Sequence, residues 1–408
     1  MTRLLVSTIC RHTPHPQPSG FLYLIDAERQ TVLQQCRMIE PAFRELDKNP
    51  RGGMRGVRGI SLYGNQVAIA NASVIFRYDQ RWNLMGIISH PVMAAIHDVL
   101  YQPAVGTGLP TLWAASARND LLLQFDLDGN LLRHVYLREP SPATRDLRWR
   151  PECLLPSDAF QSCPIEFRDP STHEEDTYDK AHVNSMCLLP DGRLLASMGL
   201  VLNLSFSSLL RIKTHLVRAG LWPTLLRINR KLRSGLHMKT NSHSDLVFQP
   251  ARAKSAVVEL RQDGSHRLAL ALEGVTVPSH SLLPDHDGKS VLYLNTTAGE
   301  VVHFNPRDGA IYSATRVTDG FLRGATWLPD GRLMLGSRNF LLVFDPASRR
   351  VVSSLQIAAN PNEAVYDIKV LPESYSAPPL SFPEHFQRST GFPVEELPQR
   401  GYRLAAAA

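Results

Sequence analysis

The chain has 408 residues, of which 43% are hydrophobic and 20% charged, and its formal net charge is +6. This composition can bury a substantial core and excludes a wholly disordered chain. Apolar runs such as Leu4–Cys10 are too short to span a bilayer, and the N-terminus lacks the small-residue cleavage site of a signal peptide. The five cysteines contain no CxxC pair and indicate a reducing compartment, so we expect a cytoplasmic protein.

The positive charge is concentrated in one segment. Residues 201–244 contain eight basic residues and no Asp or Glu, so the remainder of the chain carries the balance, −2. Aromatic residues are not interleaved with these charges, and the rest of the chain is slightly acidic. The pattern therefore predicts no nucleic-acid partner.

Short hydrophobic runs separated by Asp-Gly pairs repeat every 40–50 residues or so, about the length of a four-stranded β-propeller blade. Asp-Gly favours a tight hairpin because glycine adopts positive φ without steric cost. The segment Leu188–Ala196 (LLPDGRLLA) nearly recurs as Trp327–Leu335 (WLPDGRLML). In chain order, the predicted blades are 57–89, 96–138, 182–273 with an insertion, 277–317 and 321–358, and a sixth combines 364–372 with 4–10, 21–27 and 31–38.

We therefore predict an all-β fold, a six-bladed β-propeller that forms a single domain over residues 1–408. Strands from the two ends of the chain share one blade, which removes the open edges that a row of blades would leave. A loop insertion at 139–181 and a basic, mostly helical insertion at 202–250 interrupt the blades, and a Pro-rich tail covers 374–408.

Strand order places both insertions on the same face of the propeller, where they are predicted to cap the channel. The basic insertion has the apolar spacing of two helices, Ser205–Ala219 and a second that ends near Leu236. We interpret it as a packed lid whose Arg and Lys residues pair with acidic residues of the loop insertion, Asp179 among them. Peripheral membrane docking and a partner or homo-oligomer contact through 205–236 are the alternatives.

Three predicted inner strands begin with similar polar sequences, His182-Val-Asn-Ser, Val277-Pro-Ser-His-Ser and Gly320-Phe-Leu-Arg-Gly. These openings resemble a family of uncharacterised bacterial six-bladed β-propellers, a domain of unknown function. More distantly, the blades are similar to the NHL, gluconolactonase and paraoxonase-like propellers. The resemblance implies the fold but no agreed activity, and the calcium-binding Glu/Asn/Asp set of the gluconolactonase branch has no obvious match.

The first strand of each blade lines the central channel, so polar residues at the starts of these strands should meet at one face. Asn184, His280 and Arg323 each lie eight residues before the glycine of an Asp-Gly turn, which predicts a similar depth in the channel. The strand starts give Arg58, His97, Asp98, His182, Asn184, His280, Arg323, Tyr366 and Asp367, and all of these except Tyr366 are candidate site residues.

Three of these candidates are histidines from three different blades: His97, His182 and His280. Three neutral imidazoles can hold a divalent metal such as zinc, iron or copper. The arrangement is similar to that of the peptidyl-hydroxyglycine amidating lyase, another six-bladed propeller with three channel histidines on zinc. Histidines that merely fill the shaft and satisfy their hydrogen bonds there are the alternative.

The remaining candidates suggest how a substrate is held. Arg58 and Arg323 can bind a carboxylate, sulfate or phosphate, and Asp98 or Asp367 can orient a histidine or act as a base. Asn184 is counted with them as a candidate catalytic residue. We expect a metal-dependent lyase or hydrolase that acts on a small polar or anionic molecule. The alternative is a non-catalytic scaffold propeller that docks a partner or a membrane through its basic helices.

Overall fold

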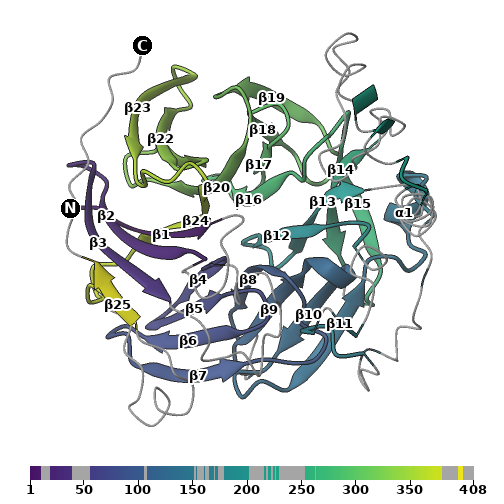
Figure 1. The fold of residues 1–408 in the computed structure, drawn as a ribbon, viewed down its shortest axis with the longest axis horizontal. Helices are drawn as coiled ribbons and strands as arrows, with labels where there is room; N and C mark the ends of the chain where they lie inside the picture. The colour runs from purple at the N-terminus through teal and green to yellow at the C-terminus, as the bar shows by residue number, and fades with distance from the viewer. Residues whose placement is uncertain are drawn as a thin grey trace.

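Six antiparallel β-sheets surround a central axis in the computed structural model (Figure 1). The structure describes residues 1–10, 19–38, 56–104, 108–150, 165–169, 171–172, 179–201, 253–261, 263–378 and 394–397, with residues 153 and 160 and a few between 216 and 228. Each sheet is one blade, and its innermost strand contacts the innermost strands of both neighbouring blades. The prediction of an all-β six-bladed propeller is confirmed.

The strands of each blade follow one another in the sequence. Blade one contains β4 (Ile60–Tyr63), β5 (Gln66–Ala70), β6 (Ile75–Asp79) and β7 (Leu84–Ile88). Blade two contains β8 (Ile96–Gln102), β9 (Thr111–Ser116), β10 (Leu121–Phe125) and β11 (Leu131–Tyr136). Blade three contains β12 (Val183–Leu188), β13 (Leu194–Val201), β14 (Lys254–Leu260) and β15 (His266–Glu273).

Blades four and five have the same order. Blade four contains β16 (His280–Pro284), β17 (Val291–Asn295), β18 (Glu300–Phe304) and β19 (Ile311–Arg316). Blade five contains β20 (Leu322–Trp327), β21 (Leu333–Ser337), β22 (Phe340–Asp345) and β23 (Arg350–Gln356).

Blade six combines strands from distant parts of the chain. Its inner strand is β24 (Glu363–Leu371), followed outward by β1 (Arg3–Cys10), β2 (Phe21–Asp26) and β3 (Thr31–Met38). Strand β1 pairs antiparallel with β24, so that Arg3 lies opposite Leu371. A fifth strand, β25 (Val394–Leu397), pairs with β3. This strand lies within the Pro-rich tail, for which no strand was predicted.

The Asp-Gly turns take the conformation that their sequence favours. Gly192 and Gly331, from the two nearly identical segments, have φ of 84° and 83°. In both turns the glycine N–H donates to the carbonyl three residues earlier, Leu189 at 2.9 Å and Leu328 at 3.0 Å. A side chain at either position would be strained, because positive φ brings Cβ against the backbone.

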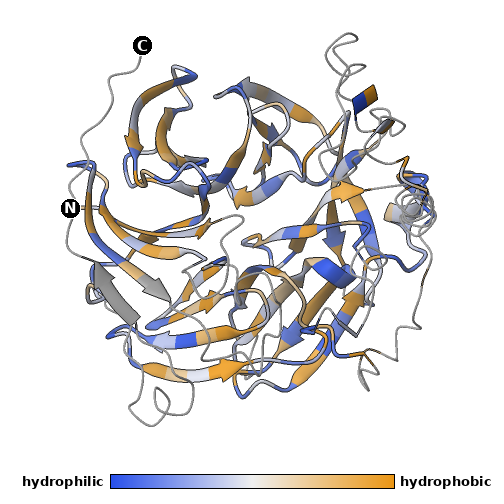
Figure 2. Ribbon diagram, in the orientation of Figure 1, coloured by the Kyte–Doolittle hydropathy of each residue, from blue (hydrophilic) through white to orange (hydrophobic). Residues whose placement is uncertain are grey.

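Hydrophobic side chains pack between neighbouring blades. Trp82 of blade one is fully buried in a cluster that includes Leu5 and Leu371 of blade six, and Phe125 of blade two packs in a cluster with Ile75 of blade one. Each such side chain contributes about 1.5–3 kcal/mol by burial. Figure 2 shows hydrophobic and hydrophilic segments alternating along the strands, the pattern of sheets whose side chains point alternately to opposite faces.

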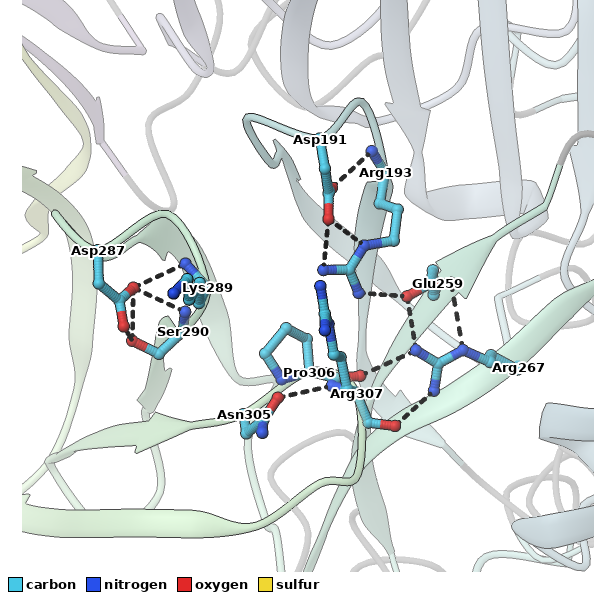
Figure 3. A network of polar contacts seen from close by, with 10 residues as sticks. All are labelled: Asp191, Arg193, Glu259, Arg267, Asp287, Lys289, Ser290, Asn305, Pro306 and Arg307. Atoms are coloured by element: carbon cyan, nitrogen blue, oxygen red, sulfur yellow. Dashed lines mark hydrogen bonds and ion pairs between the residues drawn. The ribbon is translucent and has the colours of Figure 1, made fainter.

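Polar contacts also join the blades, as the network between blades three and four in Figure 3 illustrates. Glu259 Oε2 lies 2.6 Å from Arg267 and 3.0 Å from Arg193. Burial alone would raise the pKa of Glu259, but these hydrogen-bonded arginines lower it below its usual value. Arg267 also donates to the backbone carbonyls of Pro306 and Arg307, each at 3.1 Å, and so links the two blades.

The first part of the loop insertion at 139–181 lies at the outer edge of blade three. Helix α1 (Pro142–Asp146) contacts β15, and Ser141 Oγ lies 2.8 Å from His266 Nε2. Trp149 is buried in the core between blades two and three. This part of the insertion therefore packs against the outer strand of blade three and between blades two and three, and capping of the channel face by the rest of it stays a prediction.

The basic insertion at 202–250 lies almost wholly outside the described residues, so its helices and its role as a lid stay predictions. Gly220 has φ of 68°, and the N–H of Leu221 donates to the carbonyl of Leu216 at 2.9 Å, a geometry found where helices end. Among the described residues, no helix is long and apolar enough to cross a bilayer.

Candidate functional site

Five of the six inner strands contain a β-bulge near their start. A bulge adds one residue to a strand, interrupts its pairing locally and redirects a side chain. One residue at each bulge lines the same cavity, which lies in the channel and has a volume of about 40 Å³. The residues that the strand pairing skips are His97 in β8, Asn184 in β12, Ser281 in β16, Arg323 with Gly324 in β20, and Tyr366 in β24.

The bulges revise the predicted register of the channel residues. Asn184 and Arg323 stand at equivalent positions, as the spacing from the Asp-Gly turns predicts. In blade four the bulge falls at Ser281, and His280 is instead paired with Leu294 of the neighbouring strand. The equivalence predicted for His280 is therefore wrong, although His280 does line the cavity.

His97 hydrogen-bonds through Nδ1 to the side-chain oxygen of Asn184. The amide nitrogen of Asn184 donates to the carbonyl of Ser279 at 2.7 Å, so the amide oxygen faces His97 and must accept a proton from Nδ1. Burial lowers the pKa of His97 well below its usual range, and the neighbouring His182 and arginines lower it further. His97 is therefore neutral at pH 7, with a lone pair on Nε2.

His182 is oriented by Asp179, whose Oδ2 lies 2.7 Å from Nδ1 of the imidazole. A carboxylate accepts the Nδ1 proton, which again leaves Nε2 as the acceptor when the ring is neutral. The backbone of His182 has φ of 46°, and its N–H donates to the buried carboxylate of Asp120 at 3.1 Å. Asp179 and Asp120 thus hold the side chain and the backbone of His182.

His280 donates through Nδ1 to Thr296 Oγ1, at 2.9 Å. The direction of this hydrogen bond follows from Thr296, because the Thr296 hydroxyl donates its proton to the carbonyl of Leu322, also at 2.9 Å. Three different partners therefore fix the same tautomer in three histidines, with Nε2 as the acceptor.

The three histidines differ in position. The rings of His97 and His182 meet edge to face, with centroids 4.8 Å apart, whereas His97 and His280 line the cavity without His182. Within the part of the chain that the structure describes, no three His, Cys, Asp or Glu side chains form a group that can hold a metal. The structure thus brings the predicted ligands to one region of the channel, but not into one assembled ligand set.

Asp98 and Asp367 each cross-link inner strands of neighbouring blades. Asp98 accepts the backbone N–H of Met186 in blade three at 2.7 Å, and Asp367 accepts that of Ile60 in blade one at 2.8 Å. Lys369 lies 3.0 Å from Asp367. Burial, with a smaller contribution from Asp367, raises the pKa of Asp98 to about 7. Both carboxylates therefore hold the ring of inner strands together.

Arg58 and Arg323 converge on Tyr366. The guanidinium carbon of Arg323 lies 3.2 Å from the centre of the Tyr366 ring, and that of Arg58 lies 5.8 Å from it. Arg58 also donates to the carbonyl of Ile96 at 2.6 Å. The two predicted anion-binding residues thus lie near the same buried aromatic ring.

Four polar residues of this region had no predicted role in the site, although Tyr366 was placed at the start of an inner strand. Tyr366 and Lys369 line the cavity, while Asp179 and Thr296 orient His182 and His280. The place of Tyr366 directly before Asp367 on a predicted inner strand was a usable signal. Asp179 was assigned to an acidic loop, and Thr296 lies in a turn of blade four that carries no motif.

The fold defines the chain as a six-bladed β-propeller. No protein-family model matches it, and no curated protein sequence does either.

Several solved structures are similar to the chain over most of its length. One is a protein of unknown function from Bacteroides caccae, with a TM-score of 0.48, 10% identity and coverage of 90% of this chain and 97% of that one. A structure of the nidogen/laminin complex gives a TM-score of 0.47 with the same identity and coverages. Virginiamycin B lyase from Staphylococcus aureus gives 0.37, with 10% identity over 71% of this chain and 67% of that one. At such identities the likeness concerns the fold and not the activity.

Proposed function

We propose that the protein is an enzyme, a lyase or hydrolase that acts on a small anionic molecule in its channel, beside His97, His182 and His280. The observation that supports this proposal most is the common tautomer of His97, His182 and His280. Each imidazole uses Nδ1 in a hydrogen bond, so each keeps a proton acceptor on Nε2. Histidines that only fill the channel would not need to share one tautomer.

His182 is the candidate general base. Its side chain is 17% exposed, so a substrate or a water molecule can reach it, and Asp179 stabilises the imidazolium that forms when Nε2 takes a proton. In a lyase this proton comes from the carbon next to the bond that breaks, and in a hydrolase it comes from water. Asn184 keeps the neutral His97 in place beside His182, where it can accept a hydrogen bond from the reacting group.

A divalent metal, with zinc, iron and copper as the candidates, is the second part of the proposal. Histidines that bind a metal through Nε2 usually have a hydrogen bond at Nδ1, as these three histidines do. Their Nε2 atoms are therefore suitable ligands for a divalent metal. Such an ion would polarise an oxygen of the substrate or lower the pKa of a bound water. The nearby charges of Arg58 and Arg323 oppose a cation, and the three imidazoles would have to approach one another to share it.

Elemental analysis of the full-length protein, purified without chelators, tests the metal. We expect one metal ion per chain in the wild type and its loss in His182→Ala, while the exposed His286→Ala retains it. If the purified wild type contains no metal, the metal part of the proposal is refuted, whereas the role of His182 as general base is not affected.

To test the general base, small carboxylic and phosphoric esters and β-substituted acids are screened for turnover. His182→Ala should then lose a factor of about 10²–10⁴ in rate, and an unchanged rate would refute this role.

The non-catalytic alternative rests on a separate observation. Among the described residues of the basic insertion, Leu221 and Ile228 are 53% and 49% exposed, next to the exposed Arg227. A basic surface with exposed apolar side chains can dock on an anionic membrane. Co-sedimentation with phosphatidylserine vesicles, compared between wild type and Leu221→Asp/Ile228→Asp, tests this function, and gel filtration tests a homo-oligomer contact. A cytoplasmic location stays a prediction.

A further inference from the structure

Tyr366 is a buried polar side chain of the channel that the proposed chemistry does not use. Its side chain lines the cavity and is 5% exposed, and its hydroxyl has no hydrogen-bond partner among the described residues. A buried hydroxyl without a hydrogen bond is energetically unfavourable, so a group inside the cavity should bind to it. A phenol is protonated at neutral pH and can donate this hydrogen bond.

The surroundings of Tyr366 fix its position and its electrostatic environment. Arg323 lies against one face of the ring at 3.2 Å, and the ring of His97 meets it edge to face at 5.8 Å. These two contacts therefore restrict the ring to its place in the cavity lining. A group that accepts a hydrogen bond from Tyr366 lies beside the guanidinium of Arg323, and that charge favours an anion.

The charged side chains that line the cavity balance one another, with Arg323 and Lys369 against the carboxylates of Asp98 and Asp367. Arg58, whose guanidinium carbon lies 5.8 Å from the centre of the Tyr366 ring, adds one positive charge beside the cavity. Both carboxylates accept backbone N–H groups from a neighbouring blade, and Asp367 is also paired with Lys369. The two carboxylates of the cavity thus have partners, whereas the Tyr366 hydroxyl is a donor without a partner among the described residues.

We infer that the cavity binds one small oxyanion group, such as a carboxylate, which accepts a hydrogen bond from the Tyr366 hydroxyl and faces the Arg323 guanidinium. This inference rests on the proposed function and specifies which chemical group of the anionic substrate enters the cavity. A volume of about 40 Å³ holds only a few atoms, about the space of a few water molecules. The anionic head enters the cavity, and the rest of the molecule lies at the channel mouth beside His182.

Anion binding to the full-length protein tests the inference without any assumption about the reaction. Acetate, phosphate and sulfate are titrated at constant ionic strength, with chloride as the reference salt, and the affinity is obtained from calorimetry and from the rise in melting temperature. We expect at least one oxyanion to stabilise the wild type more than chloride does. Tyr366→Phe should weaken this binding by a factor of about 10 or more, since a hydrogen bond to a charged group is lost.

The exposed Tyr312, which is 58% accessible, provides the matched control, and Tyr312→Phe should bind the oxyanion like the wild type. Arg323→Gln should weaken binding at least as much as Tyr366→Phe. Equal affinity of wild type and Tyr366→Phe, or no oxyanion effect at all, would overturn the inference and indicate that water fills the cavity. Neither result affects the metal content or the role of His182, so the inference and the proposed function fail separately.

Discussion

Asp179 and His182, three residues apart, are joined by a hydrogen bond of 2.7 Å between the carboxylate and Nδ1 of the imidazole. Asp179 comes from the end of a long insertion, whereas His182 directly precedes the inner strand of blade three. The contact therefore ties the insertion to the channel. It also gives this carboxylate a function different from the pairing with basic residues that its acidic neighbours suggested.

We predict that Asp179→Asn leaves the propeller folded but loosens His182. The amide can still offer an oxygen, but without the charge that favours the Nδ1–H tautomer. If a metal is bound, its affinity should fall by about 10- to 100-fold, the usual effect of removing a carboxylate behind a histidine ligand. Nitrogen NMR of labelled histidine measures the tautomer in the variant, and a spectrum identical to the wild type would contradict this prediction.

Gly199 should not tolerate a larger side chain. A Cβ at this position would lie 2.1 Å from Asn184 Nδ2 and 2.7 Å from the carbonyl of Ser279, so Gly199→Ala must displace Asn184 and its hydrogen bond to His97. We expect a loss of about 2 kcal/mol or more in the free energy of unfolding, measured in urea. Gly86→Ala is the control, because its Cβ would meet only the end of the Arg77 side chain, at 3.7 Å.

Asp120 holds the start of blade three through buried contacts. Its carboxylate accepts the backbone N–H groups of Lys180 and Ala181 at 2.9 and 2.8 Å, and Arg138 Nε at 2.8 Å. Asp120→Asn removes the charge opposite a buried arginine, which typically costs about 3–5 kcal/mol. Chemical denaturation measures the loss. The same change at the exposed Asp146 should have an effect near zero.

His266 should make the protein less stable in acid. Burial lowers its pKa from 6.5 to about 4, so between these values the unfolded chain takes up a proton that the folded chain does not. The contribution of the neutral His266 to the free energy of unfolding is complete above pH 6.5. It is lost as the pH falls toward 4, a change of about 3 kcal/mol.

Urea denaturation of the wild type and of His266→Gln at pH 7 and pH 4.5 measures this contribution. The variant should lose less stability than the wild type over this interval, while His286→Gln, in an exposed turn, should behave like the wild type. Equal pH dependence of wild type and His266→Gln would refute the assignment.

The six blades could be predicted because hairpin turns such as Asp191-Gly192 and Asp330-Gly331 repeat in the sequence. The bulges could not, because a one-residue shift in strand pairing leaves no local signal. His280 was for this reason placed in the wrong register. The position of Trp149 between blades was equally hidden, since an apolar residue in a loop does not reveal which surface it covers.

The candidate site was predictable residue by residue but not as an arrangement. Polar side chains at strand starts identified His97, His182, His280, Arg58 and Arg323. Their partners come from turns and from other blades, as Thr296 does for His280, and such contacts depend on the closed ring rather than on neighbours in sequence.

The pairing of Arg3 with Leu371 has a consequence for biosynthesis. Strand β1 is synthesised before blades one to five, whereas its inner neighbour β24 is made only after them. Until then one edge of β1 is unpaired and can attract other strands. Such long-range pairing slows folding and exposes intermediates to aggregation. We therefore expect β24 to pair with β1 late in folding and to bring Tyr366 to the cavity at that stage.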